Sequence, residues 1–152
     1  MEIFDRKEVI QILEAIDMPE SRIMNWTRDW QDERTLNIEG SIKTGSRTLY
    51  NENDIFKIGL AFELRRLGMA AKPIGNVLKA ITKDLNEIAW LTISRNSEEG
   101  PFDVFEGKKP RKETVWLTVN VGSLVKLLEK EIQKITESRQ KKAEEKQRKG
   151  GK

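Results

Sequence analysis

Residues 45–69 read GSRTLYNENDIFKIGLAFELRRLGM, and they contain the helix around which we predict that the chain folds. It begins with Gly45 and Arg47, which suit a hairpin tip because glycine tolerates the backbone conformations of a tight turn. Asn53 and Asp54 can cap the start of a helix, and Gly68 supplies its C-terminal stop. The apolar residues fall at helical spacing in two adjoining rows, which predicts a helix buried on two sides. These rows contain Ile55, Phe56, Ile58, Gly59, Leu60, Phe62 and Leu67.

The composition limits the classes of protein that the chain can belong to. Its 152 residues are the length of one domain, or of one small domain with an appendage. The chain has no cysteine and no histidine, which excludes disulfides, thiolate nucleophiles, Cys/His zinc sites and serine–histidine triads. We find no signal-peptide pattern and no apolar run of roughly 18 residues. We therefore expect a soluble, cytoplasmic protein with no membrane segment.

The net charge of +3 is unevenly distributed along the chain. Residues 139–152 contain seven basic and two acidic side chains, so the remainder of the chain is slightly acidic. The net charge of the whole chain is therefore no evidence for nucleic-acid binding by the folded part. Such binding has to be argued from where individual charges are placed.

Two short amphipathic helices are predicted at the N-terminus. Asp5 and Glu8 form a capping-box pattern in front of an apolar stripe, which predicts a helix over residues 6–16. A turn containing Pro19 leads to a second helix over about 19–31. Two short helices joined by a turn of three or four residues are the helix-turn-helix signature.

The second helix has two chemically different sides. Ile23, Trp26 and Trp30 share one side. We assign both tryptophans to the core because this side of the helix is apolar. Arg22 and Asn25 share the other side, with Ser21 and Arg28 flanking them. Arginine can donate two hydrogen bonds to guanine, and asparagine can pair with adenine. A merely solvated polar face is an equally good interpretation of these two helices alone.

Residues 32–50 are polar, and two short strands around residues 43–46 are predicted to form a hairpin. Lys43 and Arg47 would lie at its tip or edge, where they can meet phosphates. The alternative is a charged hairpin that binds nothing. After the buried helix, a single apolar stripe predicts another helix over about 73–88.

The period then changes from helix to strand. Residues 89–94, 102–105 and 114–121 are strand candidates separated by turn signals, which predicts a small antiparallel meander of two or three strands. Gly122 and Ser123 begin a last helix with a short heptad-like seam. This seam must pack on its own domain or on a second copy, and we assign it to dimerisation. It consists of Val125, Leu128, Ile132 and Ile135.

Several short motifs occur along residues 3–80. They are Arg6-Lys7-Glu8-Val9 with Leu13, Ser21-Arg22-Ile23 with Trp26, Gly45, Tyr50-Asn51-Glu52-Asn53-Asp54-Ile55, Leu64-Arg65-Arg66-Leu67-Gly68-Met69 and Ile74. With these motifs, and in this order, the elements resemble the N-terminal DNA-binding domain of the MerR family of transcriptional regulators. The most specific motif is the Leu-Arg-x-Leu-Gly phrase at the end of the third helix.

The resemblance implies a winged helix-turn-helix that binds pseudo-palindromic DNA as a dimer. The second helix would enter the major groove, and the hairpin, or wing, would lie along the phosphate backbone. Arg47 stands three residues before Tyr50, and Thr48 takes the place where the family usually has arginine. The resemblance implies no particular effector. The DNA-contacting residues would be Arg6, Lys7, Ser21, Arg22, Asn25, Arg28, Lys43, Arg47, Thr48 and Tyr50.

We therefore predict a mostly α (α+β) chain in three parts. Residues 1–88 form a winged helix-turn-helix with four helices, 89–137 a small meander plus a dimerisation helix, and 138–152 a basic, disordered tail. The expected function is that of a dimeric, sequence-specific transcriptional regulator near the nucleoid, with RNA polymerase or another protein as a further partner. The alternative is an architectural or recruiting DNA binder of the excisionase or phage-packaging type, without effector sensing. We expect no enzyme activity, no cofactor and no metal site.

Overall fold

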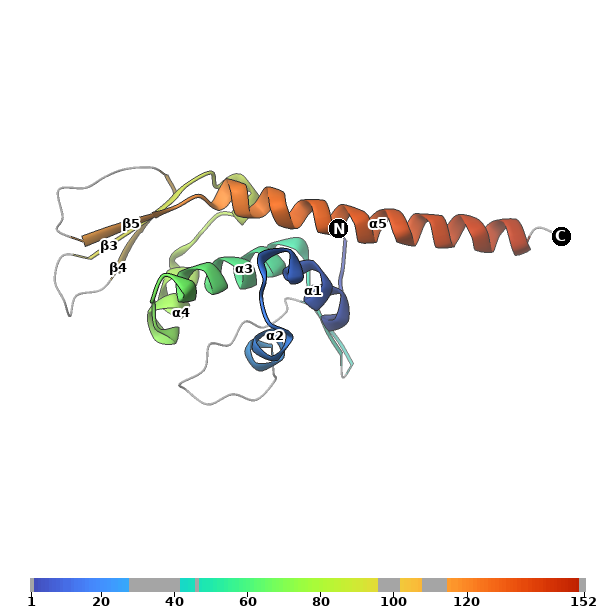
Figure 1. The fold of residues 1–152 in the computed structure, drawn as a ribbon, viewed down its shortest axis with the longest axis horizontal. Coiled ribbons are helices and arrows are strands. Elements are labelled where there is room, and N and C mark those ends of the chain that lie inside the picture. The colour runs from blue at the N-terminus through green and yellow to red at the C-terminus, as the bar shows by residue number, and fades with distance from the viewer. Residues whose placement is uncertain (1, 28–41, 46, 96–101, 108–114, 151–152) are drawn as a thin grey trace.

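The computed structural model describes residues 2–27, 42–45, 47–95, 102–107 and 115–150. It confirms the predicted α+β class, with helices as the main component and a small antiparallel sheet (Figure 1). In chain order the elements are α1 (Arg6–Leu13), a 3-10 turn (Glu14–Ile16), α2 (Glu20–Trp26), β1 (Ile42–Thr44), β2 (Arg47–Leu49), α3 (Glu52–Arg66), α4 (Ala71–Ala80), a second 3-10 turn (Leu85–Glu87), β3 (Leu91–Arg95), β4 (Phe102–Phe105), β5 (Val115–Val119) and α5 (Val121–Gly150).

The two N-terminal helices form where they were predicted, although both are shorter. The Asp5 side chain accepts a hydrogen bond from the Glu8 N–H at 2.8 Å, and the Glu8 carboxylate accepts one from the Asp5 N–H at 3.1 Å. This is the predicted capping box. Asp17 takes a left-handed conformation in the turn between the helices. α2 ends at Trp26, and the predicted core residue Trp30 lies outside the described residues.

The hairpin forms as predicted, and it leads directly into α3. β1 and β2 are antiparallel, with Thr44 opposite Arg47, and Gly45 at the tip has a positive φ of 61°. The cap of α3 is Asn51 rather than Asn53, because Asn51 and Asp54 exchange side-chain-to-backbone hydrogen bonds of 2.8 and 3.0 Å. The displaced Asn53 instead accepts a hydrogen bond from the Leu85 N–H at 2.8 Å.

Gly68 ends α3, as the sequence predicts. Its φ is 95°, and its N–H donates to the Arg65 carbonyl at 3.0 Å. The Met69 N–H donates to the Leu64 carbonyl at 3.1 Å, which completes a Schellman motif. Because a side chain at this φ is strained, glycine fixes the sharp turn into α4.

The predicted helix over residues 73–88 is wrong beyond Ala80, because α4 ends there and Ile81 is extended. The Glu106 carboxylate accepts hydrogen bonds from the N–H groups of Thr82 and Lys83 at 2.7 and 3.1 Å. These tertiary acceptors satisfy donors that a longer helix would have used internally. The apolar residues of the predicted stripe still pack in or against the core, with Leu78 only partly buried, but Leu85 and Ile88 reach the core from a 3-10 turn and its end.

The three strands are antiparallel as predicted, but they do not form a meander. The order is β4-β3-β5, so the first strand in sequence occupies the centre of the sheet. Ile93 of β3 lies between Val104 of β4 and Leu117 of β5. Residues 91–94 are all buried, which suits a central strand covered on both faces.

Helix α5 packs along α1 and α3, and this overturns the dimerisation seam. Val125, Leu128, Ile132 and Ile135 are all less than 9% exposed within a single chain. A Cβ on Gly59 of α3 would lie 2.9 Å from Leu128 Cδ1, which shows how closely the two helices cross. The seam is therefore a core contact, and it is not available to a second copy.

The disordered tail predicted over residues 138–152 is also wrong for most of its length. α5 continues as one helix to Gly150, past the rest of the chain (Figure 1). Residues 141–149 are all strong helix formers, Lys, Ala, Glu, Gln and Arg. Once packing on α1 and α3 has nucleated the helix, these residues can propagate it.

Candidate nucleic-acid interface

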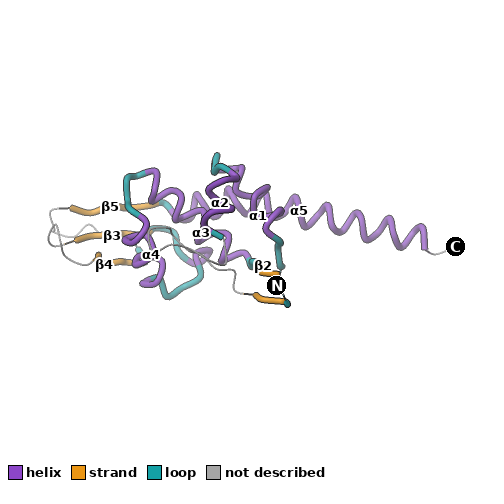
Figure 2. The backbone as a smooth tube through the Cα atoms, turned by 90° about the horizontal axis from the view of Figure 1, so that it is seen from below, coloured by secondary structure: helices purple, strands orange, loops and turns teal. Residues whose placement is uncertain are grey.

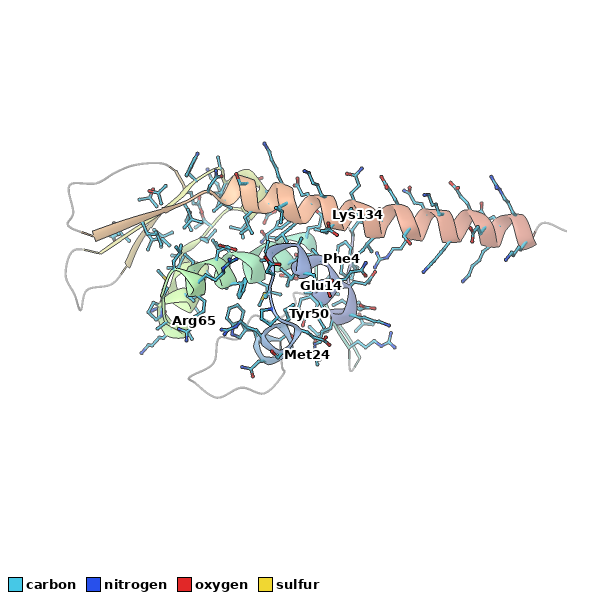
Figure 3. The ribbon with its side chains drawn as sticks, viewed as in Figure 1. Phe4, Glu14, Met24, Tyr50, Arg65 and Lys134 are labelled. Atoms are coloured by element: carbon cyan, nitrogen blue, oxygen red, sulfur yellow. The ribbon has the colours of Figure 1, made fainter. Side chains whose placement is uncertain are left out.

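Helix α2 turns one side into the core and the other to solvent. Ile23 and Trp26 are 0% and 5% exposed, which confirms that Trp26 is a core residue. Ser21 and Asn25 are exposed, and so is Met24. Figure 3 shows Met24 on the side of α2 that faces away from α5. The polar side chains singled out from the sequence therefore lie on an outer surface, within reach of a large ligand.

Arg22 is positioned by its neighbour on the same helix. Its guanidinium carbon lies 5.6 Å from the centroid of the Trp26 ring, in a cation–π contact. The side chain is half-buried, so its path is set by the tryptophan while its charged end stays near the surface. This contact restricts the guanidinium to one edge of the exposed face.

Arg6 has a structural role in place of the predicted phosphate contact. Its Nη2 donates to the Thr27 carbonyl at 2.7 Å, and the side chain is half-buried. Thr27 is the C-cap of α2, where a positive charge also suits the helix dipole. Arg6 Nε is buried and has no hydrogen-bond partner among the described residues. Arg6 therefore joins α1 to the end of α2, whereas its neighbour Lys7 is exposed.

The hairpin presents Arg47 to solvent. Arg47 is exposed, and Thr48 beside it is half-buried. The hairpin and α2 lie on the same side of the molecule, away from α5 (Figure 1). Of the other predicted contact residues, Lys43 has a backbone in β1 but no described side chain, and Arg28 lies outside the described residues.

The predicted phosphate contact of Tyr50 is contradicted by its burial. Tyr50 is 0% exposed and pairs with Phe4 through two backbone hydrogen bonds of 2.8 and 2.9 Å. Figure 3 shows both residues inside the body. Burial of its large ring outweighs solvation of the hydroxyl, whose oxygen is buried with no partner among the described residues. Tyr50 thus anchors the base of the hairpin to the N-terminal segment.

Arg139 connects α5 to the N-terminal segment beside this surface, a role that the sequence alone does not predict. It extends from α5 to the N-terminus of α1, where its Nη2 lies 2.6 Å from both carboxylate oxygens of Glu8. The same nitrogen donates to the Ile3 carbonyl at 3.0 Å, and the guanidinium lies 5.1 Å from the Phe4 ring centroid. The available signal was its position, four residues after Ile135 on the buried seam.

A second surface is an apolar groove beside α5. It is lined by Ile16, Leu124 and Leu127, with Leu67 and Val119. Leu67 and Leu127 are 58% and 43% exposed, which is high for leucine. A second hollow along α5, which shares Leu127 with the groove, is lined by Lys130 and Glu137, so charges of both signs lie at this end of the groove's rim.

A third surface is an acidic pocket at the start of α3. It is lined by Glu2, Asn51, Glu52 and Asp84 among others. Burial raises the pKa of Glu52, and the nearby charges of Glu129 and Glu2 raise it further. Within the described ranges, no group of three or more His, Cys, Asp and Glu side chains is arranged to hold a metal ion.

Comparison with known proteins adds no relative. Neither the protein-family models nor the curated proteins that were searched contain a match to this chain. None of the helices in the described part of the chain has the length and apolar character needed to cross a membrane.

Proposed function

We propose that the chain is a dimeric, sequence-specific DNA-binding transcriptional regulator of the MerR type. α2 enters the major groove, and the hairpin lies along the phosphate backbone. One observation carries this proposal: the exposed polar side of α2 and the exposed Arg47 of the hairpin lie on one side of the molecule. A buried residue fixes each element to the core: Trp26 fixes α2, and Tyr50 fixes the base of the hairpin.

The contacts divide into those that read bases and those that hold phosphates. Arg22 and Asn25 have the donors and acceptors needed for guanine and adenine, and Ser21 can add a hydroxyl contact. Lys7, Arg47 and Thr48 can contact phosphates, which would fix the register of α2. Arg6 and Tyr50 support these contacts from inside, through the end of α2 and the base of the hairpin. Arg28 and Lys43 keep their predicted roles.

The second copy in this proposal docks on the apolar groove beside α5, because the heptad seam is already buried. Leu67 and Leu127 supply exposed apolar surface. The rim contains Lys130 and Glu137, so an antiparallel copy can place each lysine near the partner's acidic residues. A two-fold interface has to be complementary to itself in this way. Such a dimer would present two copies of α2 to the two halves of a pseudo-palindrome.

Selection of bound duplexes from a random DNA pool, followed by footprinting, tests the proposal. We expect a pseudo-palindrome whose half-sites lie about one helical turn, or a multiple of it, apart. Binding without enrichment of any sequence would favour the architectural or recruiting alternative. Absence of binding to every duplex at low salt would exclude both. In the proposed role the protein works in the cytoplasm at the nucleoid, with RNA polymerase or another protein as a further partner.

A further inference from the structure

The last part of α5 leaves the body of the protein. Ile135 is the last buried residue of the helix, Arg139 is half-buried, and residues 140–150 are all exposed. Figures 1 and 2 both show this end of α5 extending beyond every other element, from two directions at right angles. An exposed helix end of this length provides no packing for its own fold, so its side chains are available to a partner.

Three lysines line one face of this exposed end. Lys142, Lys146 and Lys149 follow Ile135 and Arg139 at alternating spacings of three and four, which places them on the face that α5 turns toward α1. We call them the basic row. Within the described part of the chain, none of the three forms an ion pair. Glu145 lies on the same stretch of surface as the three lysines and Arg139, which leaves a net positive charge there.

The chemistry of the basic row does not suit another helix. A coiled-coil partner needs apolar residues at these seam positions, and lysine at three successive positions would be repelled by its own copy. The row spans about 10 Å along the helix axis. Unpaired ammonium groups at such intervals suit a ligand with regularly spaced negative charges, and the phosphate backbone of a duplex has that property.

The basic row begins next to the base of the hairpin. Arg139 donates to the Ile3 carbonyl, and the adjacent Phe4 pairs with Tyr50, the residue that follows β2. The exposed Lys7 lies beside Glu8, which Arg139 also holds. These contacts connect Arg139, which precedes the row, to the buried base of the hairpin that carries Arg47. The row lies on the side of α5 that is turned toward α1, whereas α2 and the hairpin lie on the side of the molecule away from α5, so flanking DNA has to bend toward α5 to reach the row.

We propose that the basic row binds the phosphate backbone of duplex DNA that flanks the segment contacted by α2 and the hairpin. This inference rests on the proposed function and adds a second, sequence-independent contact to it. The position of the row, next to the N-terminal segment that pairs with the base of the hairpin, favours DNA over an acidic protein segment as the occupant. The row lengthens the footprint and steepens the salt dependence of binding, because each phosphate contact releases counterions.

The test uses the full chain and two duplexes in a fluorescence-anisotropy titration over a range of salt. One duplex is limited to the selected site, and the other carries about one extra helical turn on each side. Lys142→Gln/Lys146→Gln removes two charges from the basic row. Lys141→Gln/Arg148→Gln removes two charges from another face of the same exposed end and is the matched control. Circular dichroism checks that both variants keep the helix.

We expect the row variant to bind the long duplex on the order of tenfold more weakly at low salt, with a salt slope lower by about two. Its affinity for the short duplex should change little, and the control should lose much less on the long duplex. Equal losses in the two variants, or no loss in the row variant, would overturn the inference while leaving the proposed function intact. If the unmodified chain binds neither duplex, the proposed function itself fails.

Discussion

Arg139 of α5 lies with its Nη2 2.6 Å from both carboxylate oxygens of Glu8, the residue whose side chain also caps the start of α1. One carboxylate thus connects the capping box of the first helix to the last helix, across 131 positions of sequence. Because Arg139 also donates to the Ile3 carbonyl, it fixes the N-terminal segment that pairs with the hairpin. Arg139 therefore links α5 to the segment that pairs with the base of the hairpin.

Arg139→Ala should destabilise the fold by about 1 kcal/mol, because the pair is partly exposed and its charge–charge energy is screened. Lys134→Ala is the control, since Lys134 forms an ion pair with Glu131 on the same helix but its side chain is 69% exposed. Its loss should be near zero. Urea unfolding of both variants measures the difference in the free energy of unfolding. Equal losses would show that the contact of Arg139 with Glu8 stabilises the fold no more than an exposed ion pair does.

Tyr50→Phe should leave both stability and DNA affinity close to their original values. The Tyr50 hydroxyl oxygen is buried without a partner among the described residues, so its removal takes away no hydrogen bond seen there. Tyr50→Ala should cost roughly 3–5 kcal/mol, because it leaves a cavity where an aromatic ring was fully buried. Thermal unfolding and DNA titration check both variants. A large loss of DNA affinity in a stable Tyr50→Phe protein would restore the hydroxyl as a phosphate contact.

The elements that the sequence predicts well are those with signals in neighbouring residues. The capping box of Asp5 and Glu8, the tip at Gly45 and the stop at Gly68 each act within a few positions of the chain. Local signals of this kind predict the start of α1, the tip of the hairpin and the end of α3. The outward direction of the polar side of α2 was also predictable, because Ile23 and Trp26 mark the opposite side.

The elements that the sequence predicts poorly depend on distant partners. α4 ends at Ala80 where Glu106, more than twenty residues away, takes the backbone donors of Thr82 and Lys83. The central place of β3 depends on pairing with two strands that follow it. Arg6 and Tyr50 have side chains that can contact phosphates, but residue type does not reveal that both turn inward. Hydrophobic periodicity identifies the buried face of a helix or strand, but it does not identify the element that packs against that face.

Arg22→Ala and Arg47→Ala should affect DNA binding in different ways. Loss of Arg22 should cost about 1–3 kcal/mol on the preferred site and relax sequence preference at one base pair, because a bidentate base contact is removed. Loss of Arg47 should weaken binding to all duplexes alike and lower the salt slope by about one. Competition titrations with substituted duplexes at fixed salt separate these outcomes. If both variants bind every duplex as the original chain does, α2 and the hairpin do not contact DNA.

Leu127→Glu should convert the proposed dimer to a monomer, because it places a charge in the apolar groove that the second copy would cover. The side chain is 43% exposed in the single chain, so the fold itself should persist. Gln140→Glu adds the same charge to α5 outside the groove and should leave the oligomeric state unchanged. Sedimentation velocity measures both variants. A Leu127→Glu protein that stays dimeric would place the interface elsewhere.

Glu52→Gln should stabilise the fold at neutral pH, and the gain should disappear in acid. Burial raises the pKa of Glu52 above its ordinary value of 4.5, with help from the charges of Glu129 and Glu2. A carboxyl whose pKa is higher in the folded state favours folding fully below its unfolded pKa, and this contribution is lost as the pH rises through the folded pKa. At neutral pH the ionised Glu52 therefore costs stability that the uncharged glutamine avoids, whereas below about pH 4 both side chains are neutral.

Urea unfolding of the two proteins between pH 3 and 8 measures the difference, with Glu14→Gln as an exposed control. A variant that is less stable at neutral pH would mean that the charge of Glu52 at the N-terminus of α3 stabilises the helix more than its burial costs.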